Sequence, residues 1–396
     1  MRARGAVAFA VALVAALCAG LWLGGHPSGL PGFLRDRFVG EPAGLTTEAA
    51  EVIQDTYYRP VGDTELANSS SQGMVRELRK RHKDRFSDYF SPQALESFNQ
   101  EIEGHFSGIG LSVTEVKRGL GVAKVFSGSP AAAAGIEAGD TIVSVEGESL
   151  AGVSSTEATA RIKGPEGTDV TVGVLDAKTG KVREMTLTRA EVSLPNVSSE
   201  TKTVDGHKVG YVRMLSFSEG VHADLAAAVE KVEDEGAEGI VVDLRGNPGG
   251  LLDEAVLSAG VFLPEDEVVV STKSRTQGDS VHKTVGGNLP ELPLVVLIDR
   301  NTASAAEILT AALADDGDAI VVGTRSYGKG VFQETKDLAN GGALKLTVGE
   351  YFTPDGVNLA RSKGIHPDVR VSDDPHTRVD EGKQRAFGVL AGRAEG

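Results

Sequence analysis

The sequence predicts a multidomain α/β protein with a helical N-terminal region, a β-rich middle domain and an α/β core. Its 396 residues are enough for two or three domains that each bury a core of their own. Apolar residues recur at helical spacing up to about residue 102, and then alternate as they do in strands. Beyond residue 195 the pattern changes to apolar strands that are each followed by a helix, which is typical of an α/β core.

The composition narrows the class of function. A formal net charge of −16 argues against nucleic acid or an anionic membrane surface as a main partner. The single cysteine, Cys18, excludes an intrachain disulfide framework and a cysteine-rich zinc site. The eight histidines are scattered and include no HExxH pair. We therefore expect an acidic protein that needs neither a metal nor a cofactor.

The first segment, residues 1–24, predicts a membrane anchor or a signal segment. Arg2 and Arg4 are followed by an uncharged run that lasts until His26, long enough for a helix of about 30 Å across the hydrocarbon core. The arginines would stay in the cytoplasm, so the rest of the chain would lie outside it. A cleaved signal peptide is the alternative, but the letters LWL extend the apolar run beyond the usual length of about 7–15 residues. We expect an uncleaved anchor with a single-pass topology.

Residues 25–43 are rich in glycine and proline and predict a linker, and residues 44–100 predict a helical region. Helical spacing is visible in six apolar residues: Met74, Val75, Leu78, Leu95, Phe98 and Ile102. The basic cluster Arg79–Arg85 is interpreted as a solvated helix face, so we assign no function to it.

The middle domain, residues 101–192, contains two motifs that belong together. The glycines in GIGL at 108–111 allow a tight loop, and the residues that follow predict a strand. The letters GSPAAAAGIEAGDTI follow about twenty residues later and predict a short helix and a turn into a strand. Together they resemble a PDZ domain, which implies peptide binding by the amides of Ile109, Gly110 and Leu111. A PDZ fold that docks only within its own chain is the alternative.

The α/β core, residues 195–374, has apolar strands that predict a sheet covered by helices on both faces. Ser304 follows one strand and lies at the first turn of a helix, where the dipole favours developing negative charge. A serine hydroxyl is a weak nucleophile and needs a base. Burial of Lys329, which lies between two glycines, would lower its pKa and allow the amine to take the serine proton. From these residues alone, two explanations fit the pattern equally well. One is catalysis; the other is a serine that only starts a helix and a lysine that only lies at the surface.

Four features together resemble the C-terminal processing peptidases, or tail-specific proteases: TASAAEI, YGKGVFQ, VDLRGNPGG and the upstream PDZ-like segment. The resemblance extends over about residues 45–372 and implies a crotonase-like α/β protease core. It implies a serine endopeptidase with Ser304 as nucleophile, Lys329 as general base and Gln333 as its orienting partner. It also implies an oxyanion hole formed by the backbone amides of Gly250 and Ala305.

Two other interpretations remain at this point. His366 with Asp243 or Asp368 could form a conventional triad with Ser304, but GIHPD reads as a loop that turns into the last strand. The chain could also be a non-enzymatic PDZ scaffold or a crotonase-like protein that binds apolar ligands. Such a protein would be expected to lose part of the catalytic set, which is complete here.

The last segment, residues 375–396, is a polar C-terminal tail with one short helical patch, and we expect it to be loosely held. The expected partners are proteins or peptides with a free C-terminus, and the membrane through the N-terminal helix. No nucleic-acid partner is expected, and the sequence is compatible with a homo-oligomer. The physiological substrate and the effect of the PDZ domain on activity do not follow from the sequence.

Overall fold

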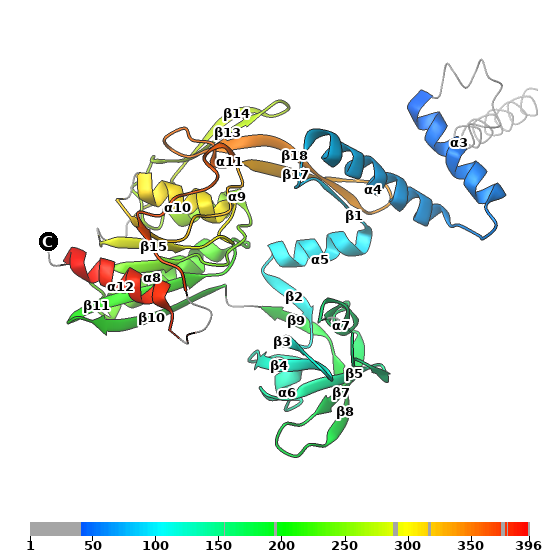
Figure 1. Cartoon of the computed structure of the whole chain (residues 1–396), viewed down its shortest axis with the longest axis horizontal. Helices are drawn as coiled ribbons and strands as arrows, with labels where there is room; N and C mark the ends of the chain where they lie inside the picture. Colours follow the sequence, from blue (N-terminus) through cyan, green and yellow to red (C-terminus); the bar gives the residue numbers. More distant parts are fainter. Residues whose placement is uncertain are drawn as a thin grey trace, which may run out of the picture. The chain divides into compact units, whose positions relative to one another are not determined.

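The computed structural model shows several folded regions connected in the order that the sequence predicts (Figure 1). The residues that it describes are 41–153, 155–193, 196–287, 292–315, 318–373, 377 and 379–394. They divide into two compact units: residues up to 91 together with 337–344, and residues 92–336 together with 345 onwards. Each unit has its own internal packing.

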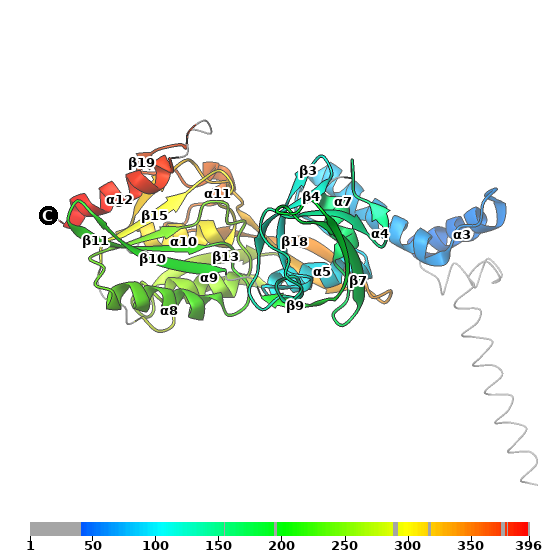
Figure 2. The same ribbon diagram turned by 90° about the horizontal axis from the view of Figure 1, so that it is seen from below.

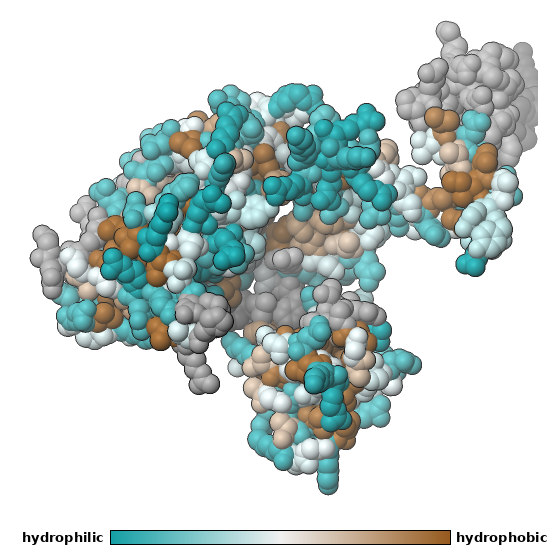
Figure 3. All heavy atoms as spheres, in the orientation of Figure 1, coloured by the Kyte–Doolittle hydropathy of each residue, from teal (hydrophilic) through white to brown (hydrophobic). Residues whose placement is uncertain are grey.

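The first unit contains the predicted N-terminal helices. They are α3 (Glu41–Thr56) and α4 (Asp63–His82), followed by the short strand β1 (Asp88–Phe90). Helix α4 begins with Asp63 and Glu65 and ends with a run of basic residues, so charges of both signs stabilise its dipole. The basic cluster near residue 80 therefore has a structural role. Apolar side chains are exposed along α3, among them Leu45 and Val52 (Figure 3).

The predicted anchor lies outside the described residues, which begin at residue 41. Within the described part of the chain, no helix is both long enough and apolar enough to cross a membrane. The predicted linker ends earlier than expected, because its last three residues are already part of α3.

The middle domain is a small antiparallel sheet with two short helices. Its strands follow the order β3-β4-β5-β7-β8, with β6 paired to β5, so that β3 is an edge strand. The bounds are β3 (Leu111–Val116), β4 (Gly119–Val125), β5 (Thr141–Val145), β6 (Glu148–Ser149), β7 (Asp169–Leu175), β8 (Val182–Thr188), α6 (Pro130–Ala133) and α7 (Ser155–Ile162). Helix α5 (Pro92–Ile102) precedes the domain, and the pair β2 (His105–Gly108) and β9 (Ala190–Ser193) joins its two ends.

The core contains a second sheet in which five strands are parallel and one, β10, is antiparallel. The order is β10 (Val197–Val204), β11 (His207–Met214), β12 (Ile240–Asp243), β15 (Leu294–Ile298), β16 (Ile320–Gly323) and β19 (Val369–Arg370). Every residue of β12 and β15 is buried, as the uninterrupted apolar runs predict for strands covered on both faces.

Helices cover both faces of this parallel sheet (Figure 2). One face packs against three helices: α8 (Val221–Asp234), α9 (Leu252–Ala259) and α10 (Ala305–Asp315). The opposite face packs against α12 (Glu381–Ala394) through Ala386, Phe387 and Leu390. The expectation of a loosely held tail is therefore wrong for this helix. The apolar stripe of α12 is narrow and is surrounded by polar residues, so the sequence did not indicate that this helix packs against the sheet.

Another group of strands carries residues of the candidate site. Strand β18 (Ala343–Phe352) pairs with β17 (Val331–Asp337) and with β13 (Val268–Ser274), which in turn pairs with β14 (Gly278–Lys283). The short helix α11 (Leu359–Ser362) follows β18, and the Asn358 side chain caps its first turn.

Candidate active site

Ser304 lies between β15 and α10, directly before the first residue of the helix. The preceding turn is held by Asp299, whose carboxylate accepts hydrogen bonds from the amides of Gly246, Asn301 and Thr302. The Thr302 hydroxyl donates to a backbone carbonyl of the loop after β12, 2.9 Å away. The letters IDRNT therefore form a rigid corner, and this corner places the serine at the start of the helix, as predicted.

The backbone of Ser304 is in the left-handed region, with a φ of 56°. A non-glycine residue in this conformation is strained by about 1–3 kcal/mol and persists only where its surroundings hold it. The Ser304 amide donates to the Glu307 carboxylate at 3.0 Å, and its carbonyl accepts from the amides of Glu307 and Ile308. Such strain at a helix start is typical of a presented functional residue.

Lys329 lies in the loop between β16 and β17, and the residue is half-buried. Burial lowers the pKa of its amine from 10.5 to about 8, because the charged form loses its hydration. The positive charge of Lys345 lowers the pKa further, while the negative charge of Glu307 opposes the shift. A substantial fraction of the amine is therefore neutral at slightly alkaline pH, as a general base must be.

Glu307 connects the serine and the lysine. Its side chain is fully buried, and its carboxylate accepts hydrogen bonds from the amides of Ser304, Gly328 and Lys329 at 3.0, 2.7 and 2.9 Å. A fourth donor is the Ser326 hydroxyl. Burial raises the pKa of Glu307, and the four hydrogen bonds oppose that rise. One carboxylate thus fixes the backbones of Ser304 and Lys329, the two residues for which the resemblance implies the roles of nucleophile and base.

Gln333 lies on β17, half-buried. Its side-chain amide donates to the Val331 carbonyl at 3.5 Å and to the Thr347 hydroxyl at 3.4 Å, and both contacts are long. Its role in orienting Lys329 remains a prediction.

The loop that ends in Gly250 packs against the serine. The Ala303 amide donates to the carbonyl of Asn247 at 3.0 Å. A Cβ on Gly249 would lie 2.7 Å from the Cβ of Ser304, so only glycine fits there. Within the described residues, the amides of Gly250 and Ala305 have no hydrogen-bond acceptor. These are the two amides for which the resemblance implies a role in an oxyanion hole, and that role remains a prediction.

In the middle domain, the loop of Ile109, Gly110 and Leu111, here called the peptide loop, is held through its backbone. Gly110 has a φ of 80°, and a Cβ there would lie 2.1 Å from the Cβ of Ser129. The Gly110 carbonyl accepts hydrogen bonds from Phe126 and Ser129, and the Ile109 side chain is buried in the core of the domain. Leu111 begins the edge strand β3. These contacts fix the conformation of the loop.

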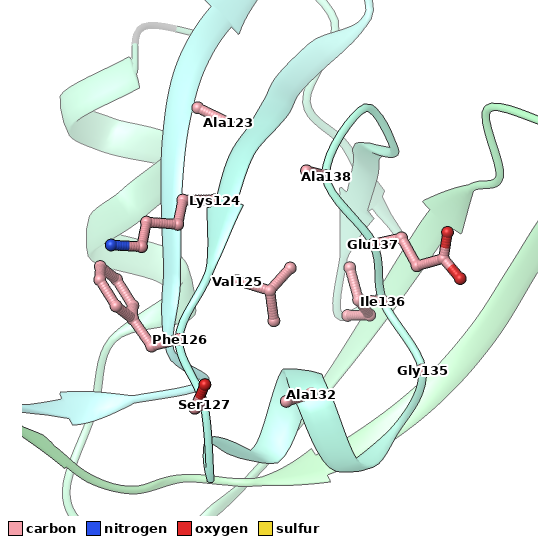
Figure 4. Close-up of a pocket in the computed structure, with 10 residues that line it drawn as sticks. All are labelled: Ala123, Lys124, Val125, Phe126, Ser127, Ala132, Gly135, Ile136, Glu137 and Ala138. Carbon is pink, nitrogen blue, oxygen red and sulfur yellow. The ribbon is translucent and has the colours of Figure 1, made fainter.

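A cavity of about 550 Å³ lies elsewhere in this domain (Figure 4). It is lined by the end of β4 and the segment after α6, with Val125 and Ile136 on facing walls. None of the described residues that line it belongs to the peptide loop.

The family of the chain follows from comparison with known proteins. Residues 208–371 match Peptidase family S41, and residues 97–175 match the PDZ domain. Carboxy-terminal processing protease CtpA of Bacillus subtilis (strain 168) is 33% identical over 323 residues, which is 82% of this chain and 67% of CtpA. The chain belongs to the carboxy-terminal processing peptidases of family S41.

Other relatives agree with this assignment. CtpB of the same organism is 33% identical over 324 residues, which cover 82% of this peptidase and 66% of CtpB. The chain thus spans about two thirds of the length of these curated relatives. Among solved structures, the photosystem II D1 C-terminal processing protease has a TM-score of 0.51 at 28% identity, with 86% of this chain and 90% of that one covered.

A further solved structure supports the fold alone. A putative S41 protease from Bacteroides fragilis NCTC 9343 has a TM-score of 0.55 at 20% identity, with 87% of this chain and 96% of that one covered. The predicted fold class, a helical region, a PDZ domain and an α/β protease core, is confirmed.

The conventional triad finds no support in the geometry of this peptidase. His366 is exposed, and its Nε2 faces the carbonyl of Ser362. Asp243 binds Tyr211 and Arg245 instead, and Asp368 accepts a hydrogen bond from the amide of Val321.

Glu307 is the site residue that the sequence reasoning missed. A signal was present, because a serine followed three residues later by a glutamate is the spacing of a capping box. That motif predicts only a stable helix start. The carboxylate's further contacts with Gly328 and Lys329 depend on a loop distant in sequence, which no local pattern encodes.

Proposed function

We propose that this chain is an extracytoplasmic serine endopeptidase that uses a Ser–Lys mechanism and recognises protein C-termini through its PDZ domain. The observation that carries the proposal is the shared carboxylate of Glu307, which fixes the backbones of Ser304, at a strained helix start, and of Lys329, in the loop between β16 and β17. The membership of family S41 supports the same reaction class.

In the proposed reaction, the neutral amine of Lys329 removes the proton of the Ser304 hydroxyl as Oγ attacks the scissile carbonyl carbon. The carbonyl oxygen becomes an oxyanion and accepts hydrogen bonds from the amides of Gly250 and Ala305. The intermediate collapses when Lys329 returns the proton to the departing amine, which leaves an ester on Ser304. Water then attacks the ester with Lys329 again as the base, and Gln333 orients the lysine throughout.

The PDZ loop supplies selectivity in this proposal. The amides of Ile109, Gly110 and Leu111 bind the C-terminal carboxylate of a substrate, and its last residues extend along the edge strand β3. The rigid glycine turn supports this role, because a preformed loop loses little conformational entropy on binding.

The place of action follows from the charge pattern of residues 1–24. Two arginines before a long uncharged run direct the rest of the chain out of the cytoplasm. Cell fractionation and N-terminal sequencing test this part. An anchored protein sediments with membranes and exposes its catalytic region to added protease in spheroplasts, whereas a mature N-terminus near Ala19 or His26 would establish secretion.

The central test uses the full-length chain and its Ser304→Ala variant on an unfolded protein with an apolar C-terminal residue. Wild type should cleave the substrate and react covalently with a fluorophosphonate, and Ser304→Ala should do neither while it keeps its thermal unfolding temperature. Metal chelators should leave the activity unchanged. Full activity in Lys329→Ala together with loss in His366→Ala would overturn the Ser–Lys assignment.

A further inference from the structure

Asn247 is a buried polar residue that the proposed mechanism does not use. It lies in the loop between β12 and α9, and its exposed fraction is 0%. Asparagine is mostly exposed in folded proteins, so a fully buried one in a loop calls for a physical explanation.

The side chain of Asn247 connects two segments of the core. Its Oδ1 accepts a hydrogen bond at 2.9 Å from the amide of Gly249, two residues further on, and this bond closes a turn. Its Nδ2 donates at 3.1 Å to the carbonyl of Met214, the last residue of β11. The side chain therefore holds the turn against the end of β11.

The backbone of Asn247 joins the same loop to the nucleophile. The Asn247 amide donates to the carbonyl of Leu244 at 3.2 Å, and the Asn247 carbonyl accepts from the amide of Ala303 at 3.0 Å. Ala303 directly precedes Ser304. The end of β11, the loop after β12 and the turn before Ser304 thus meet at one asparagine.

The bonds of the two glycines in this loop determine where the amide of Gly250 points. Phe217 and Gly250 form an isolated parallel bridge. In this bridge the Phe217 amide donates to the Gly249 carbonyl, and the Leu251 amide donates to the Phe217 carbonyl, at 2.9 and 2.8 Å. A parallel bridge uses the groups on either side of its middle residue, so the amide of Gly250 itself points away from Phe217.

The other expected donor lies directly beside the same turn. A Cβ on Gly249 would lie 2.7 Å from the Cβ of Ser304 and 2.9 Å from the amide nitrogen of Ala305. Gly249 is buried against these atoms, whereas Gly250 is exposed. The turn that Asn247 closes therefore separates the amide of Ala305 from that of Gly250 by only one glycine.

We infer that Asn247 is a positioning residue for the oxyanion hole, because it fixes the turn at Gly249 and Gly250 relative to the segment of Ser304. Two amides stabilise an oxyanion only when both lie within hydrogen-bond distance of the same point. The inference rests on the proposed function, which assigns this role to the amides of Gly250 and Ala305.

Two other contacts join the loop to the serine segment, and both lie further from the glycines. The Gly246 amide donates to Asp299, and the Thr302 hydroxyl donates to the carbonyl of Leu244. These bonds remain when the Asn247 side chain is removed. We therefore expect the loss of that side chain to displace the donors and not to unfold the core.

The decisive variant is Asn247→Ala in the full-length chain, which removes both side-chain hydrogen bonds. We expect kcat to fall about 10- to 100-fold with KM within about twofold of wild type, because a displaced donor weakens only the stabilisation of the oxyanion. The pH at which kcat/KM is half-maximal should not change, since Lys329 is untouched.

A pair of inhibitors separates the oxyanion hole from the rest of the fold. When a peptide aldehyde binds, Oγ of Ser304 adds to the aldehyde carbon, Lys329 takes the serine proton, and the aldehyde oxygen becomes the oxyanion. The corresponding peptide alcohol binds without this reaction. Asn247→Ala should weaken binding of the aldehyde by the same factor by which it lowers kcat and leave binding of the alcohol unchanged.

Thr284→Ala is the matched control. Thr284 is buried in the same compact unit, and its hydroxyl donates to the carbonyl of Pro264 and accepts from the amide of Glu267. Its loss should lower the thermal unfolding temperature and leave kcat and the affinity for the aldehyde unchanged.

Asn247→Ser is the conservative variant, because a serine hydroxyl can close the same turn more weakly than an asparagine. It should recover part of the kcat and of the aldehyde affinity that Asn247→Ala loses. If Asn247→Ala does not fold, Asn247→Ser takes its place in each comparison with wild type.

The outcomes separate this inference from the proposed function. If kcat and aldehyde affinity stay within about twofold of wild type, the positioning role is wrong and the serine mechanism stands. If the aldehyde and the alcohol weaken equally, the loss does not lie in the oxyanion hole and the inference also fails. If wild type neither cleaves the substrate nor reacts with a fluorophosphonate, the proposed function fails and the inference falls with it.

Discussion

At the scale of single residues, the lowered pKa of Lys329 determines the pH dependence that the proposed mechanism predicts. The general base must be neutral, and the amine is protonated below its pKa of about 8. We therefore expect kcat/KM to rise with pH, to be half-maximal near pH 8 and to level off above it. Replacing Lys345 by methionine removes a positive charge that lowers this pKa, so the half-maximal point should move to higher pH. An unchanged pH profile in Lys345→Met would contradict this assignment.

The same pKa has a consequence for stability. The folded pKa lies below the unfolded value of 10.5, so the unfolded chain binds more protons between pH 8 and 10.5 and stability rises with pH across that interval. Below pH 8 the full penalty applies, at most about 3 kcal/mol. Lys329→Met should accordingly abolish activity and yet raise the free energy of unfolding at pH 7, measured by urea denaturation. The gain should vanish above about pH 10.5.

Glu307 provides a second test at this scale. Glu307→Gln keeps the size of the side chain but places an amide group among four donors, at least one of which then loses its acceptor. We expect about a 100-fold loss of kcat and about 1–3 kcal/mol lower stability. Glu254→Gln is a matched control, since Glu254 is a buried carboxylate that binds the amides of Gly220 and His222. It should lose stability without a comparable loss of kcat.

At the scale of elements, the peptide loop between β2 and β3 can be tested with two alanines. Gly110→Ala and Gly128→Ala share a similar backbone cost, because φ is 80° at one and 75° at the other. Only at Gly110 would the new Cβ collide, 2.1 Å from the Cβ of Ser129, whereas Gly128 has open space. We expect Gly110→Ala to raise KM for long substrates at least tenfold and Gly128→Ala to change it little. Equal KM values would show that this loop does not bind substrate.

The elements also show how far sequence reasoning extends. The strand-then-helix units and the placement of Ser304 at a helix start follow from local apolar patterns, and the structure agrees with both. The packing of α12 against the sheet could not be predicted from the sequence. Its contacts are made by Ala386, Phe387 and Leu390, which form an apolar stripe too narrow to be recognised among polar neighbours. Contacts between segments distant in sequence, such as those of Glu307, leave no local pattern and depend on the complete fold.

At the scale of the whole molecule, recognition and cleavage are assigned to different domains, and one substrate pair can separate them. A long unfolded polypeptide with a free, apolar C-terminal residue should be cleaved with a lower KM than its C-terminally amidated form. The amide lacks the negative charge and presents donors to the donors of the loop, so binding weakens while the scissile bond is unchanged. Steady-state kinetics on both forms measures the difference. Identical kcat/KM values would contradict tail recognition.

The shared carboxylate of Glu307 also gives the catalytic centre a mechanical property. The carboxylate of Glu307 joins the start of the helix to the loop of Lys329, because it accepts hydrogen bonds from the amides of Ser304 and Lys329 at 3.0 and 2.9 Å. A displacement of either segment must strain or break these bonds, so the positions of Ser304 and Lys329 depend on each other. An effector that moves the loop of Lys329 would therefore also displace Ser304 without contacting it. In the proposed mechanism, such a displacement would inactivate the enzyme from a site at which no bond is made or broken.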